Sequence, residues 1–178
     1  MTSLYLSALS FSRFIAHLLA GCGGAVLLML VGLNVLSIMG RAFVPLDIGI
    51  GPILGIYDIT ELGMAVAIFA FLPLAQLNDA HARVDVFKSV IPALINRCLE
   101  LLFAVVMCGI ASIGCWRLAV GMADKFSYGE TTQIAQIPIW TGYAAGLVGA
   151  SGFVLVSLFC IWRSALRLAG REPEEGGL

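Results

Sequence analysis

The sequence FLPLAQLNDAHARVDVF, residues 71–87, contains the sharpest change of polarity in the chain. An almost purely apolar run ends, and four ionisable side chains follow within nine residues: Asp79, His81, Arg83 and Asp85. Two interpretations are open at this point. The four groups form a catalytic or ligand-binding site, or they mark the place where a helix leaves a lipid bilayer and the chain turns along its surface.

The composition of the whole chain decides the solvent in which it folds. Of 178 residues, 60% are hydrophobic and only 12% are charged, and the mean hydropathy is +1.00. Soluble domains are nearer a quarter charged, because they must cover their surface with polar groups. The chain is therefore predicted to be an integral membrane protein. Its net charge of −1 provides no strong field to recruit nucleic acid, so no nucleic-acid partner is expected.

Runs without charged residues locate the membrane spans. Asp, Glu, Lys and Arg are absent from residues 14–40, 62–78, 101–116 and 131–162. A helix needs about 20 residues to cross the hydrocarbon layer, so each run supplies one crossing. We predict an all-α protein with one membrane domain over residues 1–178 and four spans, at about 14–39, 59–77, 99–120 and 139–162. The first span is too long for a signal peptide and is expected to be retained.

The positive charges predict the orientation of these spans. Seven Lys and Arg residues lie on one side: Arg13, Arg83, Lys88, Arg97, Arg163, Arg167 and Arg171. Three lie on the other: Arg41, Arg117 and Lys125. Because cytoplasmic loops are enriched in Lys and Arg, both termini and the 78–98 connection are predicted to be cytoplasmic. The last three arginines, at intervals of four after Trp162, are expected to face lipid headgroups.

Residues 79–91 have the pattern of an amphipathic helix. Apolar residues from Val84 onward recur at spacings of three and four, whereas His81, Asp85 and Lys88 fall on the opposite face. Such a segment lies in the headgroup plane with its apolar face down. We therefore predict a short interfacial helix between the second and third spans. A proton-handling or metal-binding role for His81 and Asp85 remains the alternative.

The sequence YDITELG, residues 57–63, opens the second span with two carboxylates. Asp58 and Glu61 have the spacing of a capping box, with Asp58 at the N-cap and Glu61 reaching back to a free amide. Arg41, at the end of the first span, is placed to pair with either. The alternative is that Glu61 is an ion ligand of a stand-alone exporter, although a coupling carboxylate is expected deeper in the membrane.

The sequence contains few features that are typical of a catalytic site. It has no phosphate-binding loop, no nucleophile elbow and no H-E-x-x-H metal motif. The two histidines, His17 and His81, both lie near the predicted cytoplasmic edge, which does not suit the facing axial ligands of a haem. We therefore expect no enzyme activity, no cofactor and no metal site, and a small membrane enzyme or cytochrome subunit is the disfavoured alternative.

Small residues mark helix faces that allow close approach. The stretch GYAAGLVGASG places Gly142, Gly146 and Gly149 on overlapping small-xxx-small tracks. Further glycines occur in the first and third spans, at Gly21, Gly24, Gly32, Gly109 and Gly114. Such faces let helix backbones pack closely in lipid. They serve either contacts among the chain's own helices or contacts with an additional protein neighbour.

Four features together resemble one family over roughly residues 14–165. These are Arg41 at the end of the first span, T-E-L at the start of the second, NDAHARVDVF after it, and GETTQIAQIPIW before the fourth. The chain resembles the small membrane subunit of tripartite ATP-independent periplasmic (TRAP) transporters, the DctQ-like family. Its most family-like part runs from Glu61 through His81 and Asp85.

The resemblance implies a function that composition does not show. Members pair with a large polytopic permease subunit that carries the substrate and sodium sites, and a periplasmic substrate-binding protein delivers an organic acid anion such as a dicarboxylate. The small subunit would brace the large one among the lipids of the bacterial inner membrane, and loops 41–58 and 121–138 would face the delivering protein. By position, Arg41, Glu61, His81 and Asp85 match recurrent polar residues of the family, with structural or interfacial roles.

Overall fold

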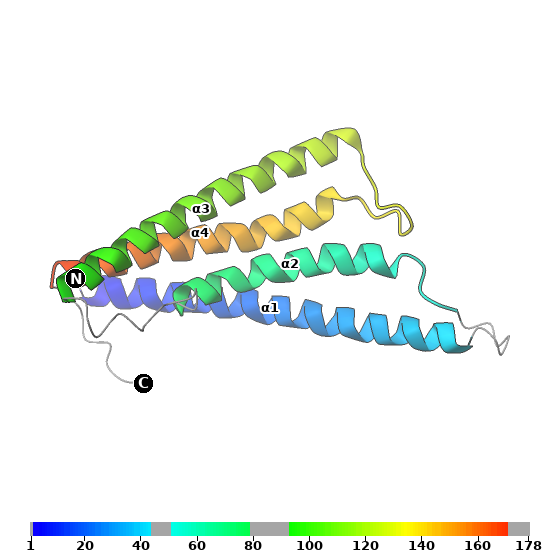
Figure 1. The fold of residues 1–178 in the computed structure, drawn as a ribbon, viewed down its shortest axis with the longest axis horizontal. Helices are drawn as coiled ribbons and strands as arrows, with labels where there is room; N and C mark the ends of the chain where they lie inside the picture. The colour runs from blue at the N-terminus through cyan, green and yellow to red at the C-terminus, as the bar shows by residue number, and fades with distance from the viewer. Residues whose placement is uncertain (1, 44–50, 79–92, 171–178) are drawn as a thin grey trace.

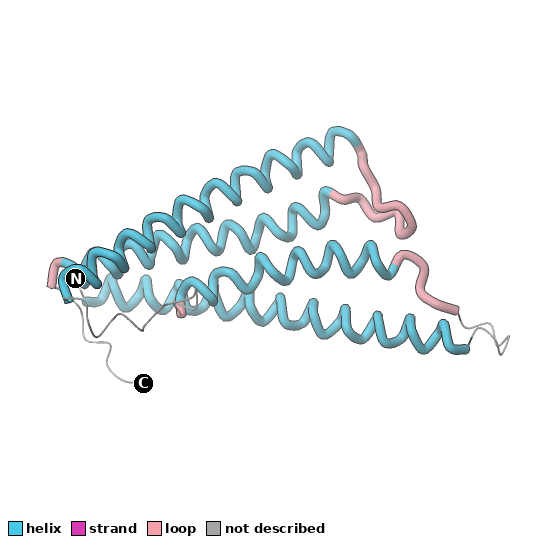
Figure 2. The backbone as a smooth tube through the Cα atoms, in the orientation of Figure 1, coloured by secondary structure: helices cyan, strands magenta, loops and turns pink. Residues whose placement is uncertain are grey.

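The computed structural model describes residues 2–43, 51–78 and 93–170. Within these residues the chain forms four long elements, and all four are α-helices (Figures 1 and 2). Their bounds are α1 Thr2–Phe43, α2 Ile56–Leu77, α3 Ala93–Tyr128 and α4 Trp140–Leu168. Each helix is long and apolar enough to cross a membrane. The prediction of an all-α chain with four such helices is therefore confirmed. The predicted interfacial helix at 79–91 lies outside the described residues.

Two helices are much longer than the predicted spans. α1 has 42 residues, about 63 Å at 1.5 Å per residue, and α3 has 36 residues, about 54 Å. The hydrocarbon layer is only about 30 Å thick. The spans predicted from residues 14 and 99 concern only the part of each helix that crosses lipid, and α1 and α3 begin before them, because a charged side chain limits how deep a residue lies in lipid and does not end a helix.

The four helices form a single layer in the order α1–α2–α4–α3 (Figure 1). α2 packs against α1 and α4, and α4 packs against α3 and, near the start of α1, also against α1, whereas no part of the described chain brings α3 against α1 or α2. α4 is the central helix: half of its most apolar segment is buried, compared with 17–22% in the other three. Two antiparallel hairpins, α1–α2 and α3–α4, are thus joined side by side through α2 and α4.

Gly149 sets the distance between α2 and α4. A Cβ atom built there would lie 2.6 Å from the carbonyl carbon and oxygen of Phe69, so the two backbones are in direct contact. A Cβ on Gly142 would lie 2.6 Å from the side chain of Leu62, whereas one on Gly146 would make an ordinary 3.4 Å contact with Phe69. All three predicted glycines of α4 therefore lie toward α2, and Gly149 makes the closest backbone approach of the three.

In α1 the glycine that contacts α2 is not one of the three predicted there. Gly23 packs against α2, where a Cβ would lie 3.0 Å from Cβ of Ala70 and 3.3 Å from the carbonyl oxygen of Ala67. Gly21, Gly24 and Gly32 have no atom within 4 Å of the corresponding position. The sequence thus identified small residues in α1 without identifying which of them touch α2.

The hairpins converge at one end of the layer, called the closed end, and spread at the other, called the open end (Figure 1). At the closed end, where α1 begins and α4 ends, α1 extends past the end of the shorter α2 and reaches the last turns of α4. The ring of Tyr5 lies 5.9 Å from that of Phe159 and 6.1 Å from that of Trp162. Tyr5 and Phe159 belong to a buried core with Leu9, Ala16, Leu77, Val156 and Cys160, and Trp162 lies at its exposed edge.

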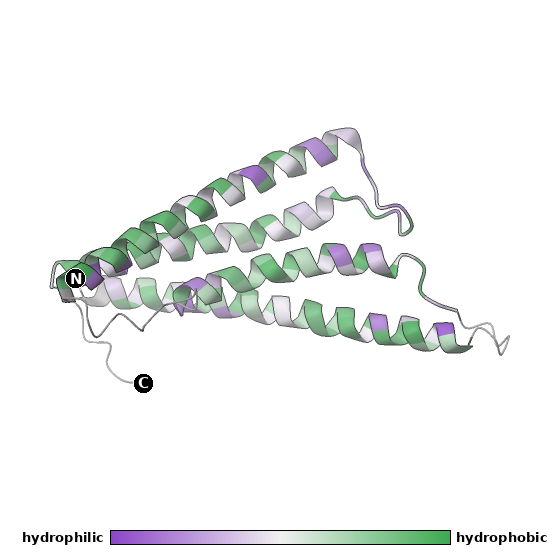
Figure 3. Cartoon of the chain, viewed as in Figure 1, coloured by the Kyte–Doolittle hydropathy of each residue, from purple (hydrophilic) through white to green (hydrophobic). Residues whose placement is uncertain are grey.

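The surface of the layer is apolar along most of its length, and hydrophilic residues gather toward its ends (Figure 3). Leu28 of α1, Phe103 and Trp116 of α3 and Leu158 of α4 are each more than half exposed. In water this surface would drive aggregation, whereas in lipid it costs nothing. The layer is therefore built to stand in a membrane with its polar groups at the two rims.

Candidate functional site

A polar structure with several backbone hydrogen bonds lies at the open end, in the connection between α3 and α4. Backbone hydrogen bonds run from Thr132 N–H to the Ile137 carbonyl (2.9 Å) and from Ile139 N–H to the Glu130 carbonyl (3.0 Å). The Thr132 hydroxyl oxygen also accepts from Ile137 N–H at 3.0 Å. Thr131 and Pro138 form an antiparallel bridge. Residues 130–139, called the tongue below, therefore fold back on themselves as a small hairpin.

Asp58 of α2 holds the tip of the tongue. Its Oδ2 atom accepts hydrogen bonds from the backbone N–H groups of Ile134 and Ala135, both at 2.9 Å. These donors lie 76 and 77 residues further along the chain. Hydrogen bonds to a charged acceptor are the stronger kind, so this contact fixes the tongue against the start of α2.

The predicted capping box is wrong. α2 begins at Ile56 with Gly55 at the N-cap, no side chain caps it, and Asp58 already lies inside the first turn. The helix starts earlier than the pattern indicated, so Asp58 is past the cap position, and its carboxylate is used by two amides of the tongue. Glu61 lies one turn further along α2 and is exposed.

Gly55 allows the tongue to sit directly on the start of α2. Its φ is +75°, a left-handed conformation that residues with a Cβ rarely adopt. A Cβ atom at this position would also lie 2.6 Å from Cβ of Ala135. The turn before α2 therefore requires glycine for both its backbone conformation and its contact with the tongue.

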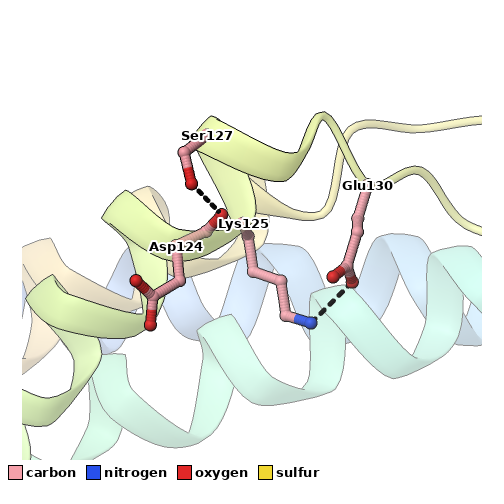
Figure 4. Close-up of polar contacts among 4 residues, drawn as sticks. All are labelled: Asp124, Lys125, Ser127 and Glu130. Atoms are coloured by element: carbon pink, nitrogen blue, oxygen red, sulfur yellow. Dashed lines mark hydrogen bonds and ion pairs between the residues drawn. The ribbon is translucent and has the colours of Figure 1, made fainter.

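A second link joins the tongue to the end of α3. Lys125 Nζ lies 2.5 Å from Oε2 of Glu130, with both side chains partly exposed (Figure 4). The carboxylate of neighbouring Asp124 points away from this pair, while its main-chain carbonyl accepts from the Ser127 hydroxyl at 2.8 Å (Figure 4). The tongue is thus tied to α2 through Asp58 and to α3 through Lys125.

Arg41 does not pair with the carboxylates suggested for it. All three residues are described and exposed or partly exposed, yet no ion pair within 4.0 Å joins Arg41 to Asp58 or Glu61. The polar contact between α1 and α2 is instead Asn34 Nδ2 to Thr60 Oγ1, at 3.0 Å. Asn34 is the one amide side chain in the apolar run 14–40, and that isolated polar residue was the available signal.

The closed end contains buried polar groups that the sequence placed at the surface. Arg163, expected to face lipid headgroups, is only 9% exposed, and its Nη1 donates to the carbonyl of Leu77 at the end of α2 (3.5 Å). Arg167 pairs with Glu100 of α3 at 3.9 Å. The prediction was wrong for Arg163, because α4 is the central helix and contacts α1, α2 and α3. Arg167 is partly exposed, so its position at the lipid headgroups stays a prediction.

The remaining predicted site residues are His81 and Asp85, and both lie outside the described residues. Among residues 2–43, 51–78 and 93–170 no three His, Cys, Asp or Glu side chains come close enough to hold a metal ion. The candidate functional site is therefore the assembly of Asp58, Gly55, the tongue and the Lys125–Glu130 pair at the open end.

A family comparison covers both the tongue and the helix layer. Residues 30–169 match the family described as tripartite ATP-independent periplasmic transporters, DctQ component. The chain belongs to the DctQ family. The match spans 140 of 178 residues and includes Asp58 and all of α2, α3 and α4. Neither a curated protein nor a solved structure gives a significant match to this chain.

Membership confirms the resemblance seen in the sequence. DctQ proteins are components of tripartite transporters and are not an enzyme family. Together with four helices able to cross a membrane, this makes the chain a multi-pass membrane subunit of a transporter. The polar structure at the open end and the broad apolar faces are therefore to be interpreted as parts of a larger assembly.

Proposed function

We propose that this chain is the small permease subunit of a TRAP-type secondary transporter in the bacterial inner membrane. It braces the large membrane subunit and helps to dock a periplasmic binding protein during sodium-coupled uptake of an organic acid anion such as a dicarboxylate. The observation that carries the proposal is the DctQ match over residues 30–169. The side-by-side arrangement of the described helices supports it, because a brace needs broad faces.

The uncovered face of α1 supports a helical partner. Gly21 and Gly32 are eleven residues apart, so they lie on nearly the same side of α1, and neither has a neighbour within 4 Å. Leu28 lies between them and is 76% exposed. Small residues beside a large one form the kind of face against which a second helix packs in lipid. We propose that the large subunit covers this face.

The distribution of positive charge supports an orientation with the tongue outside. Arg13, Arg97, Arg163 and Arg167 lie toward the closed end, and Arg41, Arg117 and Lys125 lie toward the open end. The excess of positive residues favours the cytoplasm for the closed end, with both termini there. On this orientation the tongue and the start of α2 face the periplasm, where a binding protein arrives.

No observation favours the stand-alone exporter. Glu61 lies in the second turn of α2, near the rim of the layer, and its side chain is exposed. A carboxylate that couples ion movement is expected to face a cavity within the membrane. Within the described parts of the chain Glu61 belongs to no group of three His, Cys, Asp or Glu side chains that could hold a metal ion.

Purification of the tagged chain from its native host in mild detergent tests the proposal. The expected result is a large polytopic partner in stoichiometric amount. Uptake of an organic anion by proteoliposomes should then require sodium, the large partner and the binding protein. A homo-oligomer without a partner, or uptake by this chain alone, would contradict the proposal.

The variant Glu61→Gln separates an interfacial role from an ion-binding role. As an exposed polar residue near the rim, Glu61 is expected to contribute to the subunit interface, so the variant should lower the yield of the two-subunit complex. The apparent affinity for sodium, measured per assembled complex, should remain unchanged. The reverse result, normal yield with weakened sodium dependence, would make Glu61 an ion ligand.

A further inference from the structure

We propose that Asp58 is a positioning residue: its carboxylate fixes the direction of the tongue, and the tongue so held is the contact surface for the substrate-loaded binding protein. This inference rests on the proposed function, because it assumes that a binding protein docks at the open end. Neither the fold nor the family match assigns a role to Asp58.

Asp58 lies where the two hairpins spread apart. The hairpins spread toward the open end (Figure 1), and the tongue is joined to α2 there by two backbone N–H groups that donate to the Asp58 carboxylate. One carboxylate oxygen receives both Ile134 N–H and Ala135 N–H at 2.9 Å. Two consecutive amides on one acceptor define the direction of the tip as well as its distance.

The tongue forms its own hairpin, so Asp58 determines where it points and not whether it folds. The bonds between Thr132 and Ile137 and between Glu130 and Ile139 lie within the tongue and do not involve α2. Without Asp58 these bonds would remain, while the N–H groups of Ile134 and Ala135 would donate hydrogen bonds to water instead. The expected consequence is a tongue that is intact but free to move relative to α2.

The surface around Asp58 and the tongue has the composition of a protein-binding site. Leu54, Tyr57 and Ile134 are 81%, 69% and 57% exposed and lie on the segments that Asp58 joins. Gln133 and Gln136 of the tongue are also exposed, and residues 131–139 carry no charge. An aromatic and aliphatic centre with an uncharged polar edge is typical of protein interfaces, whereas an anionic headgroup or substrate would require cations.

The test uses the complete two-subunit complex in proteoliposomes, with the loaded binding protein varied in concentration. Asp58→Ala should raise the KM for the loaded binding protein about tenfold, the cost expected when one charge-assisted contact no longer orients the surface, and should leave kcat per complex unchanged. Asp58→Asn keeps an acceptor oxygen without the charge, so most of the effect should be rescued. Asp124→Asn removes a charge at the same end without touching the tongue and should match the wild type.

Hydrogen exchange of the purified complex provides a readout that does not depend on transport. In Asp58→Ala, peptides covering residues 131–138 should exchange about tenfold faster, because two amides lose a charged acceptor. Peptides from the middle of α4 should be unchanged. If Asp58→Ala does not assemble, Asp58→Asn is measured in both assays, with a smaller shift expected in the same direction.

The outcomes separate this inference from the proposed function. Wild-type uptake that does not depend on the binding protein would overturn the proposed function and the docking role with it. Binding-protein-dependent uptake with an unchanged KM in Asp58→Ala would overturn the role of Asp58 alone. A lower kcat at constant KM, or unchanged exchange in the tongue, would also overturn it, because both contradict a residue that acts by orienting the docking surface.

Discussion

The two ends of the helix layer are held together by different physical means. At the closed end, Tyr5, Phe159 and Val156 pack in a buried core between α1 and α4. At the open end the hairpins spread, and a carboxylate of α2 reaches two amides of the tongue. Packing in lipid depends on the fit of side-chain shapes, whereas a hydrogen bond at the rim depends on direction and on access to water.

This difference follows from the lengths of the helices. α2 has 22 residues and α1 has 42, so α2 ends part-way along α1. The first turns of α1 are therefore free to contact α4. No corresponding overlap exists at the other end, where α2 begins beside the tongue. A closed end held by packing and an open end held by polar contacts suit a subunit that is anchored on one side and contacted on the other.

Substitution at the contact between α2 and α4, called the seam below, should lower the stability of the protein most strongly. In Gly149→Ala the new Cβ would lie 2.6 Å from the Phe69 carbonyl, so the helices must separate, at an expected cost of about 2–3 kcal/mol. Gly146→Ala adds the same methyl group one turn earlier with a 3.4 Å contact and should be nearly neutral. Thermal unfolding of the complex in detergent measures both, and equal destabilisation would show that the seam is not held by backbone contact.

The core at the closed end should come second. Phe159→Ala removes a buried ring that contacts Tyr5 and Trp162 and should cost about 1–2 kcal/mol. The cost is below that of a soluble core, because the ring is transferred between protein and lipid, so mainly packing contacts are lost. Phe103→Ala, on the exposed surface of α3, serves as the control. A larger effect from Phe103 would place a partner on α3 and weaken the contrast between the two ends.

The helices were predictable from the sequence because lipid selects for composition, and charge-free runs such as 131–162 record that selection directly. Their lateral order was not predictable, since it depends on which small residue meets which backbone. Gly23 packs against Ala70, whereas Gly21 and Gly24 on either side of it face open space. No property of three glycines within four residues distinguishes them before the helices are placed.

Only part of the candidate site could be predicted from the sequence, for a similar reason. An acid in the first turn of a helix followed by Glu three residues later suggests a local cap, and Asp58 with Glu61 satisfies that pattern. The partner amides of Asp58 lie more than 70 residues away, in a connection whose hairpin bonds are made by its backbone. Backbone donors carry no signature in the identity of their residues, so the contact becomes visible only when the tongue is folded against α2.

The ion pair at the other side of the tongue should contribute least, and this prediction sharpens the contrast between packing and polar anchoring. Lys125 and Glu130 are 32% and 42% exposed, so water screens their attraction, and such a surface pair contributes little to stability. Lys125→Met keeps the length of the side chain and removes the charge. It should accelerate hydrogen exchange in residues 131–138 far less than Asp58→Ala does, and the difference from wild type should vanish in concentrated salt, where exposed pairs are screened. If Lys125→Met instead loosens the tongue as much as Asp58→Ala, the open end is held by a network of charges and not by the single carboxylate of α2.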